Sequence, residues 1–152
     1  MYRIHFSTSD KRWLQIYYEK CNNCRDSRGN EGTCLGIALG NIRDFNHATS
    51  KDMWLYKSTT GALFHGGEVL DAMNTLPEYS MDDIITAQLD LEEGTLSFAK
   101  NNAPLILAFD NLPCGSVELF PVVVFHTSNH GERVQLYDLT KLPKDQVLLS
   151  GM

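Results

Sequence analysis

Two short pairs of residues in this chain of 152 residues are of types that could bind a metal ion. Cys21 and Cys24 are separated by two residues, and His126 and His130 lie four positions apart. Two thiolates and two imidazoles form the ligand set of a structural zinc site. About a hundred residues separate the pairs, whereas compact fingers use about a dozen. Folding could still bring the two segments together, but the spacing favours free thiols and unrelated loop histidines. We therefore predict no metal site and no cofactor.

A cysteine nucleophile with a histidine base is the second chemistry that these residue types allow. Cys34 or Cys114 would have to pair with His65 or His126. Cys34 falls in an apolar run, where a small buried thiol packs and does not react. Cys114 lies in a Pro-Cys-Gly turn with no histidine beside it in the sequence. The chain also lacks G-x-S-x-G, H-E-x-x-H and a Gly-rich phosphate loop. We therefore predict that the domain is not an enzyme.

Strands are the elements that must position these residues, because apolar residues recur with a period near two almost throughout. The clearest stretch is a hairpin, with strands at 84–91 and 95–98 around a tight turn at 92–94. Short helical patterns occur only at 69–73 and after residue 141. Further strands are expected at 13–18, 34–39, 53–56, 62–65, 105–109, 119–125 and 133–137, the last two forming a pair.

Many short strands, separated by turns at intervals of about 8–12 residues, are typical of a sandwich or barrel. We predict an all-β fold, a two-sheet antiparallel β-sandwich of one domain at 1–140, followed by a tail at 141–152. A hydrophobic content of 43% is sufficient for a core. The aromatic residues expected in that core are Trp13, Trp54, Phe98, Phe109 and Phe120.

The net charge of −6 argues against nucleic-acid binding, which needs clustered Lys and Arg. Residues 1–28 hold six of the thirteen basic residues, whereas eight acids and no base lie between Lys57 and Lys100. We interpret that acidic stretch as a solvated rim. No apolar run is long enough to cross a bilayer, so no membrane contact is expected. Four cysteines are too few for a disulfide scaffold, so the expected location is cytoplasmic and reducing.

The order of motifs from Gly36 to Tyr137 resembles a SPRY domain. Asn102 stands where the family often has Gly, and Asn tolerates the positive φ of that turn. Residues 44–47 and 53–56 are most similar to SPRY modules of very large HECT-type E3 ubiquitin ligases. The matching strings are Gly36-Ile37-Ala38, Trp54-Leu55-Tyr56, Gly61-Ala62-Leu63-Phe64-His65-Gly66-Gly67, Asp82-Asp83-Ile84-Ile85, Leu89-Asp90-Leu91-Glu92-Glu93-Gly94-Thr95-Leu96-Ser97-Phe98, Asn101-Asn102, Ala108-Phe109 and Leu119-Phe120-Pro121-Val122-Val123.

This resemblance implies a concanavalin-like jelly roll whose edge loops bind a short peptide segment of a partner protein. It further implies a monomeric module that recognises substrates, or docks, within a large ubiquitin ligase. Phe45 lies among polar residues, so it is either a plug over the core or an exposed anchor. The residues expected to bind the partner are Arg43, Asp44, Phe45, Asn46 and His47 in one loop and His126, Thr127 and Asn129 in another.

Two other functions stay open from the sequence. Similar sandwiches bind carbohydrate, but a lectin site usually needs an exposed aromatic platform or calcium, and the sequence shows neither. A purely structural module packed against neighbouring domains would carry a large exposed apolar patch. In that case the loops that hold residues 43–47 and 126–129 would be exposed to solvent and would bind no partner.

Overall fold

The computed structural model describes residues 11–20, 33–70, 76–80, 83–115, 117–125 and 132–138, and every regular element among them is a strand. The predicted all-β class is therefore confirmed. The strands are β1 (Lys11–Lys20), β2 (Cys34–Leu39), β3 (Met53–Lys57), β4 (Leu63–His65), β5 (Glu68–Leu70), β6 (Ile84–Asp90), β7 (Thr95–Lys100), β8 (Ile106–Phe109), β9 (Leu119–Val124) and β10 (Glu132–Asp138).

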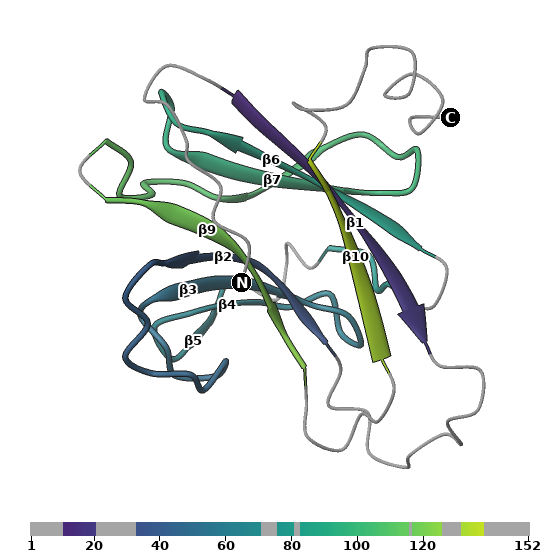
Figure 1. Cartoon of the computed structure of the whole chain (residues 1–152), viewed down its shortest axis with the longest axis horizontal. Helices are drawn as coiled ribbons and strands as arrows, with labels where there is room; N and C mark the ends of the chain where they lie inside the picture. The colour runs from purple at the N-terminus through teal and green to yellow at the C-terminus, as the bar shows by residue number, and fades with distance from the viewer. Residues whose placement is uncertain are drawn as a thin grey trace.

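Two five-stranded sheets form the layers of the sandwich (Figure 1). The first sheet has the order β10-β1-β6-β7-β8, and the second has the order β5-β4-β3-β2-β9. Every pairing within them is antiparallel. The predicted two-sheet antiparallel sandwich is thus confirmed, and its strands other than β5 lie within a few residues of their predicted positions.

The main core lies between the sheets and follows from strand alternation. Leu35 and Ile37 of β2 are buried there, as are Ile85 and Leu89 of β6, because every second residue of a strand points to the same face. Phe98 is 1% exposed and touches Tyr56 with ring centroids 5.1 Å apart. Four of the five predicted core aromatics, Trp54, Phe98, Phe109 and Phe120, are buried. The side chain of Trp13 lies outside the described residues.

The second sheet also buries its outer face, and this affects the loop that follows β2. Cys34 and Ala38 of β2 and Met53 and Leu55 of β3 form a second buried cluster with Val122. Three partly buried residues pack on this cluster, namely Ile42, Phe64 and Val124. A strand that is buried on both faces has apolar residues at successive positions. This is why every residue from Cys34 to Ala38 is buried.

One pairing predicted from the sequence is wrong, because β9 and β10 are not neighbours. β9 pairs with β2 in the second sheet, and β10 pairs with β1 in the first. β9 is an edge strand, which suits Pro121, since proline has no N–H for a second neighbour. The helical turn predicted at 69–73 is also wrong at its first residues, because Glu68–Leu70 form strand β5, which pairs with β4.

Two turns show how local backbone chemistry fixes the hairpins. Gly61 has the predicted positive φ, at 70°, and a Cβ at this position would lie 1.8 Å from the carbonyl oxygen of Leu76. In the β7–β8 turn the positive φ falls on Asn101, at 53°, and not on Asn102 as expected. The Asn101 side chain explains the shift, because its Oδ1 accepts the N–H of Ile84 at 3.0 Å and so ties the turn to β6.

Candidate partner-binding site

The loop at 40–52 connects β2 to β3 at one end of the second sheet. The N–H of Leu39 donates to the carbonyl oxygen of Asp52 at 2.9 Å, which closes the base of the loop. Ile42 packs onto the outer buried cluster, so the loop folds back over the sheet. Five of the eight predicted partner-binding residues, 43–47, belong to this loop.

Two carboxylates hold the shape of the loop from inside. Asp52 Oδ2 accepts the N–H of Arg43 at 2.8 Å and, more weakly, that of Asp44 at 3.4 Å. Asp44 in turn accepts the N–H of Asn46 at 2.9 Å and the hydroxyl of Thr49 at 2.6 Å. The Thr49 hydroxyl, with the Asn46 N–H, holds the pKa of the Asp44 carboxyl below its usual value. Asp44 is therefore a scaffold residue of the site.

Asn46 makes the tightest bend of the loop. Its Oδ1 accepts the N–H of Ala48 at 2.9 Å, and its carbonyl oxygen accepts the N–H groups of Thr49 and Ser50 at 3.1 and 2.9 Å. Asparagine favours turns because its side chain can cap nearby backbone groups in this way. The predicted role of Asn46 in contacting a partner is untested, whereas its role in shaping the loop is visible.

Phe45 is an exposed aromatic residue at the tip of this hydrogen-bonded loop. Its side chain is 71% exposed, the largest value among the exposed large hydrophobic residues of the described chain. The sequence left two interpretations of Phe45 open, and the interpretation as a plug over the core is therefore wrong. The backbone on either side of Phe45 is fixed, because the N–H groups of Asp44 and Asn46 both donate to carboxylates of the loop.

His47 extends the site onto the β4–β5 hairpin. Its ring meets the ring of Phe64 edge-on, with centroids 5.6 Å apart. Phe64 pairs with Val69 across the hairpin, and Val69 is 58% exposed. The N–H of Gly66 donates to the carbonyl of Ser50 at 2.8 Å, which fastens the loop to the hairpin turn. Phe45, His47, Phe64 and Val69 together are called the loop–hairpin surface below.

The sequence prediction missed Phe64 and Val69 as parts of the site. Phe64 was assigned only to a motif of the fold, and Val69 to a helical turn. The signal that could have found them is the hairpin itself: two apolar residues five positions apart, around Gly66 and Gly67, become direct neighbours when the chain reverses.

The second predicted wall of the site, His126, Thr127 and Asn129, lies outside the described residues. Cys21, Cys24 and His130 of the considered zinc set lie outside them as well. Among the residues that the structure does describe, no group of three or more metal-ligating side chains comes together. Within the same residues no helix is long and apolar enough to span a membrane.

The two described cysteines are free thiols in unreactive surroundings. Burial raises the pKa of the Cys34 thiol to about 11, and the nearby charge of Lys57 offsets only part of this rise. Burial, with the negative charge of Asp90, also raises the pKa of Cys114. A thiol must ionise to act as a nucleophile, so neither cysteine is poised for catalysis.

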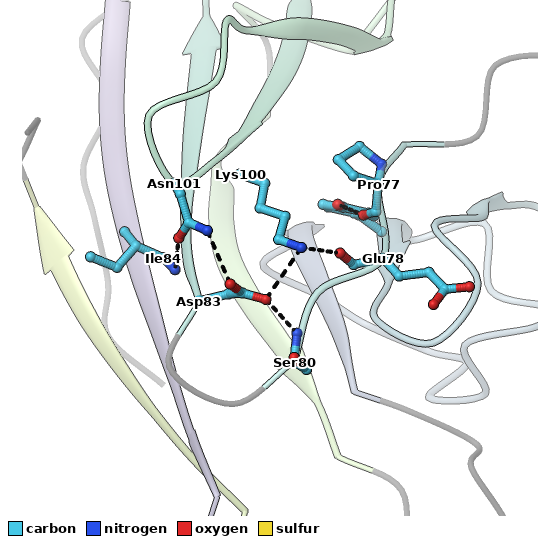
Figure 2. A network of polar contacts seen from close by, with 8 residues as sticks. Pro77, Glu78, Ser80, Asp83, Ile84, Lys100 and Asn101 are labelled. Atoms are coloured by element: carbon cyan, nitrogen blue, oxygen red, sulfur yellow. Dashed lines mark hydrogen bonds and ion pairs between the residues drawn. The ribbon is translucent and has the colours of Figure 1, made fainter.

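A polar network marks the opposite end of the sandwich, where β6 begins and β7 ends (Figure 2). Asp83 accepts the Ser80 N–H at 2.7 Å and the Asn101 amide at 3.0 Å, and its Oδ2 lies 3.5 Å from Lys100 Nζ. Lys100 also donates to the carbonyl of Glu78 at 2.9 Å. The network joins the segment before β6 to the β7–β8 turn, so its role is structural.

Comparison with known proteins agrees with this architecture. Residues 15–138 match the model of the SPRY domain. The crystal structure of the SPRY domain of human HERC1 is 39% identical and superposes with a TM-score of 0.73, covering 90% of this chain and 79% of that one. This match supports the resemblance to SPRY modules of very large HECT-type ligases.

Two more distant structures share the fold. The TRIM65 PSpry domain is 16% identical with a TM-score of 0.57, covering 85% of this chain and 65% of that chain. A human SPRY domain is 17% identical with a TM-score of 0.56, covering 83% and 75%. The match of the family model over most of the chain, together with the identity to the HERC1 domain, shows that this chain belongs to the SPRY domain family.

Proposed function

We propose that this domain is a non-catalytic peptide-binding module, and that the loop–hairpin surface is where it holds its partner. SPRY domains are in general protein–protein interaction modules. The observation that carries the proposal is the 71% exposure of Phe45 on a loop held by at least four internal hydrogen bonds to Asp52, Asp44 and Asn46. A rigid aromatic anchor loses little conformational entropy on binding, and such anchors dominate small interfaces.

Substrate recognition or docking within a large ubiquitin ligase is the cellular task that we propose for this module, in the cytoplasm. The identity to the HERC1 domain supports that setting. The free thiols of Cys34 and Cys114 are compatible with a reducing compartment. We further propose that the isolated domain binds as a monomer.

Affinity capture on the immobilised domain tests this function, with Phe45→Ala beside the wild type. Phe45→Ala should abolish capture of the specific partner and leave the melting temperature nearly unchanged, because the side chain is mostly exposed. Synthetic segments of the captured protein, titrated against both forms, then locate the bound peptide.

Leu107→Ala is the matched control for this experiment. Leu107 is 58% exposed and lies on β8 of the other sheet, so its removal deletes a similar exposed apolar side chain away from the loop. Equal capture by the wild type and Phe45→Ala would overturn the proposal. Binding to a glycan array in place of peptides would favour the lectin alternative.

A further inference from the structure

We infer that the peptide held at the loop–hairpin surface is acidic, with Asp or Glu side chains flanking an apolar residue. This inference rests on the proposed function and names the chemistry of its partner. Three basic side chains border the surface, namely Arg43, Lys51 and Lys57, and are called the basic rim below. The rim stands out because the whole chain carries a net charge of −6.

Lys57 is placed by its contact with the apolar part of the surface. Its Nζ lies 5.8 Å from the centroid of the Phe64 ring. Leu55 pairs with Phe64, and Phe64 pairs with Val69, so residue 57 follows on the same strand face by alternation. Among the described strand residues of that face, from β2 to β5 and β9, Lys57 alone is charged.

Lys51 and Arg43 border the surface from the loop side. Both are exposed. Lys51 lies against the β4–β5 turn, where its Cγ would be 3.7 Å from a Cβ built on Gly66. Arg43 is two residues before Phe45, and its backbone N–H is fixed on Asp52. Among the described residues, neither Arg43 nor Lys51 has a carboxylate within ion-pair distance.

The acids of the same loop accept hydrogen bonds from the loop itself, so their oxygens are occupied in holding its shape. Asp52 accepts the N–H groups of Arg43 and Asp44, and Asp44 accepts donors from Asn46 and Thr49. Glu68 is exposed on the hairpin but pairs with His65, so it alternates away from Val69. Asp44 and Asp52 keep their negative charges, but Arg43, Lys51 and Lys57 outnumber them, so the surface carries a net positive charge in a chain whose net charge is −6.

Charge complementarity selects an acidic partner at such a surface. Carboxylates on either side of an apolar residue would meet the basic rim while that residue packs against Phe45, Phe64 and Val69. Elsewhere the acidic domain repels the same peptide, so attraction is confined to one place and orients the encounter. A single exposed charge pair contributes little to the binding free energy. The preference for an acidic peptide therefore depends on the three bases acting together.

A peptide array measures this preference directly. The probes are synthetic twelve-residue peptides with varied apolar centres, each made in three versions whose flanks are Asp/Glu, Asn/Gln or Lys/Arg. The wild-type domain should bind the acid-flanked set best, and affinity should fall as ionic strength rises. The variants Arg43→Glu, Lys51→Glu and Lys57→Glu should each weaken binding of the acidic set about three- to tenfold. The triple variant should prefer the Lys/Arg-flanked set.

The control variant Asn102→Asp/Ala103→Glu makes the net charge more negative by two, as one Lys→Glu reversal does. Both residues are exposed in the β7–β8 turn, at the far end of the sandwich, and this variant should bind like the wild type. Equal binding of all three flank sets, a preference for neutral or basic flanks, or no binding by any set would overturn the inference. The proposed function is judged separately, because loss of binding in Phe45→Ala does not depend on which flanks are preferred.

Discussion

At the scale of single residues, Asp44 ties together the loop backbone that carries Phe45. Its two oxygens accept the Asn46 N–H and the Thr49 hydroxyl, so one carboxylate spans the residues on both sides of His47. Without these bonds the loop would sample more conformations, and binding would have to order it again. Asp44 is therefore a positioning residue, and its predicted contact with a partner stays a prediction.

Asp44→Ala should weaken binding of the partner peptide about three- to tenfold through this loss of order. The melting temperature should change little, since the bonds lie within one exposed loop. Amide hydrogen exchange should rise at Asn46 and Ala48 and stay constant in β2 and β3. Unchanged exchange in the loop would show that Asp44 does not order it. Asp110→Ala is a suitable control, because Asp110 is an exposed acid after β8.

Acidification should have the same effect as Asp44→Ala, and the sign follows from the lowered pKa. The Asp44 carboxyl stays ionised until the pH falls below the ordinary aspartate value of 3.8, so the ordered loop is fully present above that pH. It is lost as pH falls through the lower pKa of the folded protein. Carboxyl chemical shifts of the wild type, followed against Asp44→Ala by NMR, would give this pKa directly.

At the scale of elements, the Asp83 network fastens the segment at 76–80 to the main hairpin (Figure 2). That segment also contributes Tyr79, whose hydroxyl donates to the carbonyl oxygens of Thr33 and Tyr56. The two hairpin strands β6 and β7 were predicted well because alternation and Gly94 are local signals. The network itself was not predicted, because its contacts across the hairpin join residues 17 or more positions apart, as Asp83 and Lys100 are, and only the bond from Ser80 to Asp83 is local.

Asp83→Asn should lower the free energy of unfolding by about 0.5–1 kcal/mol, after allowing for solvent screening. Burial raises the pKa of Asp83, but the Ser80 N–H, the Asn101 amide and the Lys100 ammonium outweigh it, so the pKa is lowered overall. The stabilisation is therefore present above pH 3.8 and lost as pH falls through the folded value.

Urea unfolding of the wild type and Asp83→Asn at several pH values measures this contribution. The two proteins should differ most near neutral pH, and the difference should shrink as acid protonates Asp83. A difference that is constant with pH would mean that the carboxylate charge does not matter. Glu92→Gln is the control, because it removes one negative charge from an exposed residue in the turn between β6 and β7.

At the scale of the whole molecule, Phe98 connects the two sheets. It lies on β7 in the first sheet, contacts Tyr56 of the second, and is 1% exposed. Which strands share a sheet could not be deduced from local patterns: the adjacent β9 and β10 were expected to pair, yet they lie in different sheets. Register within a hairpin depends on a turn, but sheet assignment depends on packing between distant strands.

Phe98→Ala should lower the free energy of unfolding by about 3–5 kcal/mol, because a cavity would be left between the sheets. Thermal or urea unfolding checks this value. Ser97→Ala is the neighbouring control, since Ser97 alternates to the opposite face of β7 and is only partly buried. A loss below about 1 kcal/mol would show that the core repacks around the missing ring.

The neighbouring positions of β1 and β10 have a consequence for how this domain can be built into longer proteins. The two strands are antiparallel partners, with Leu14 opposite Asp138 (Figure 1), so the chain enters and leaves the first sheet at the same end of one ladder. A host polypeptide can therefore carry the sandwich as an insert whose two attachment points nearly coincide. Such an insert requires little separation of the flanking host segments.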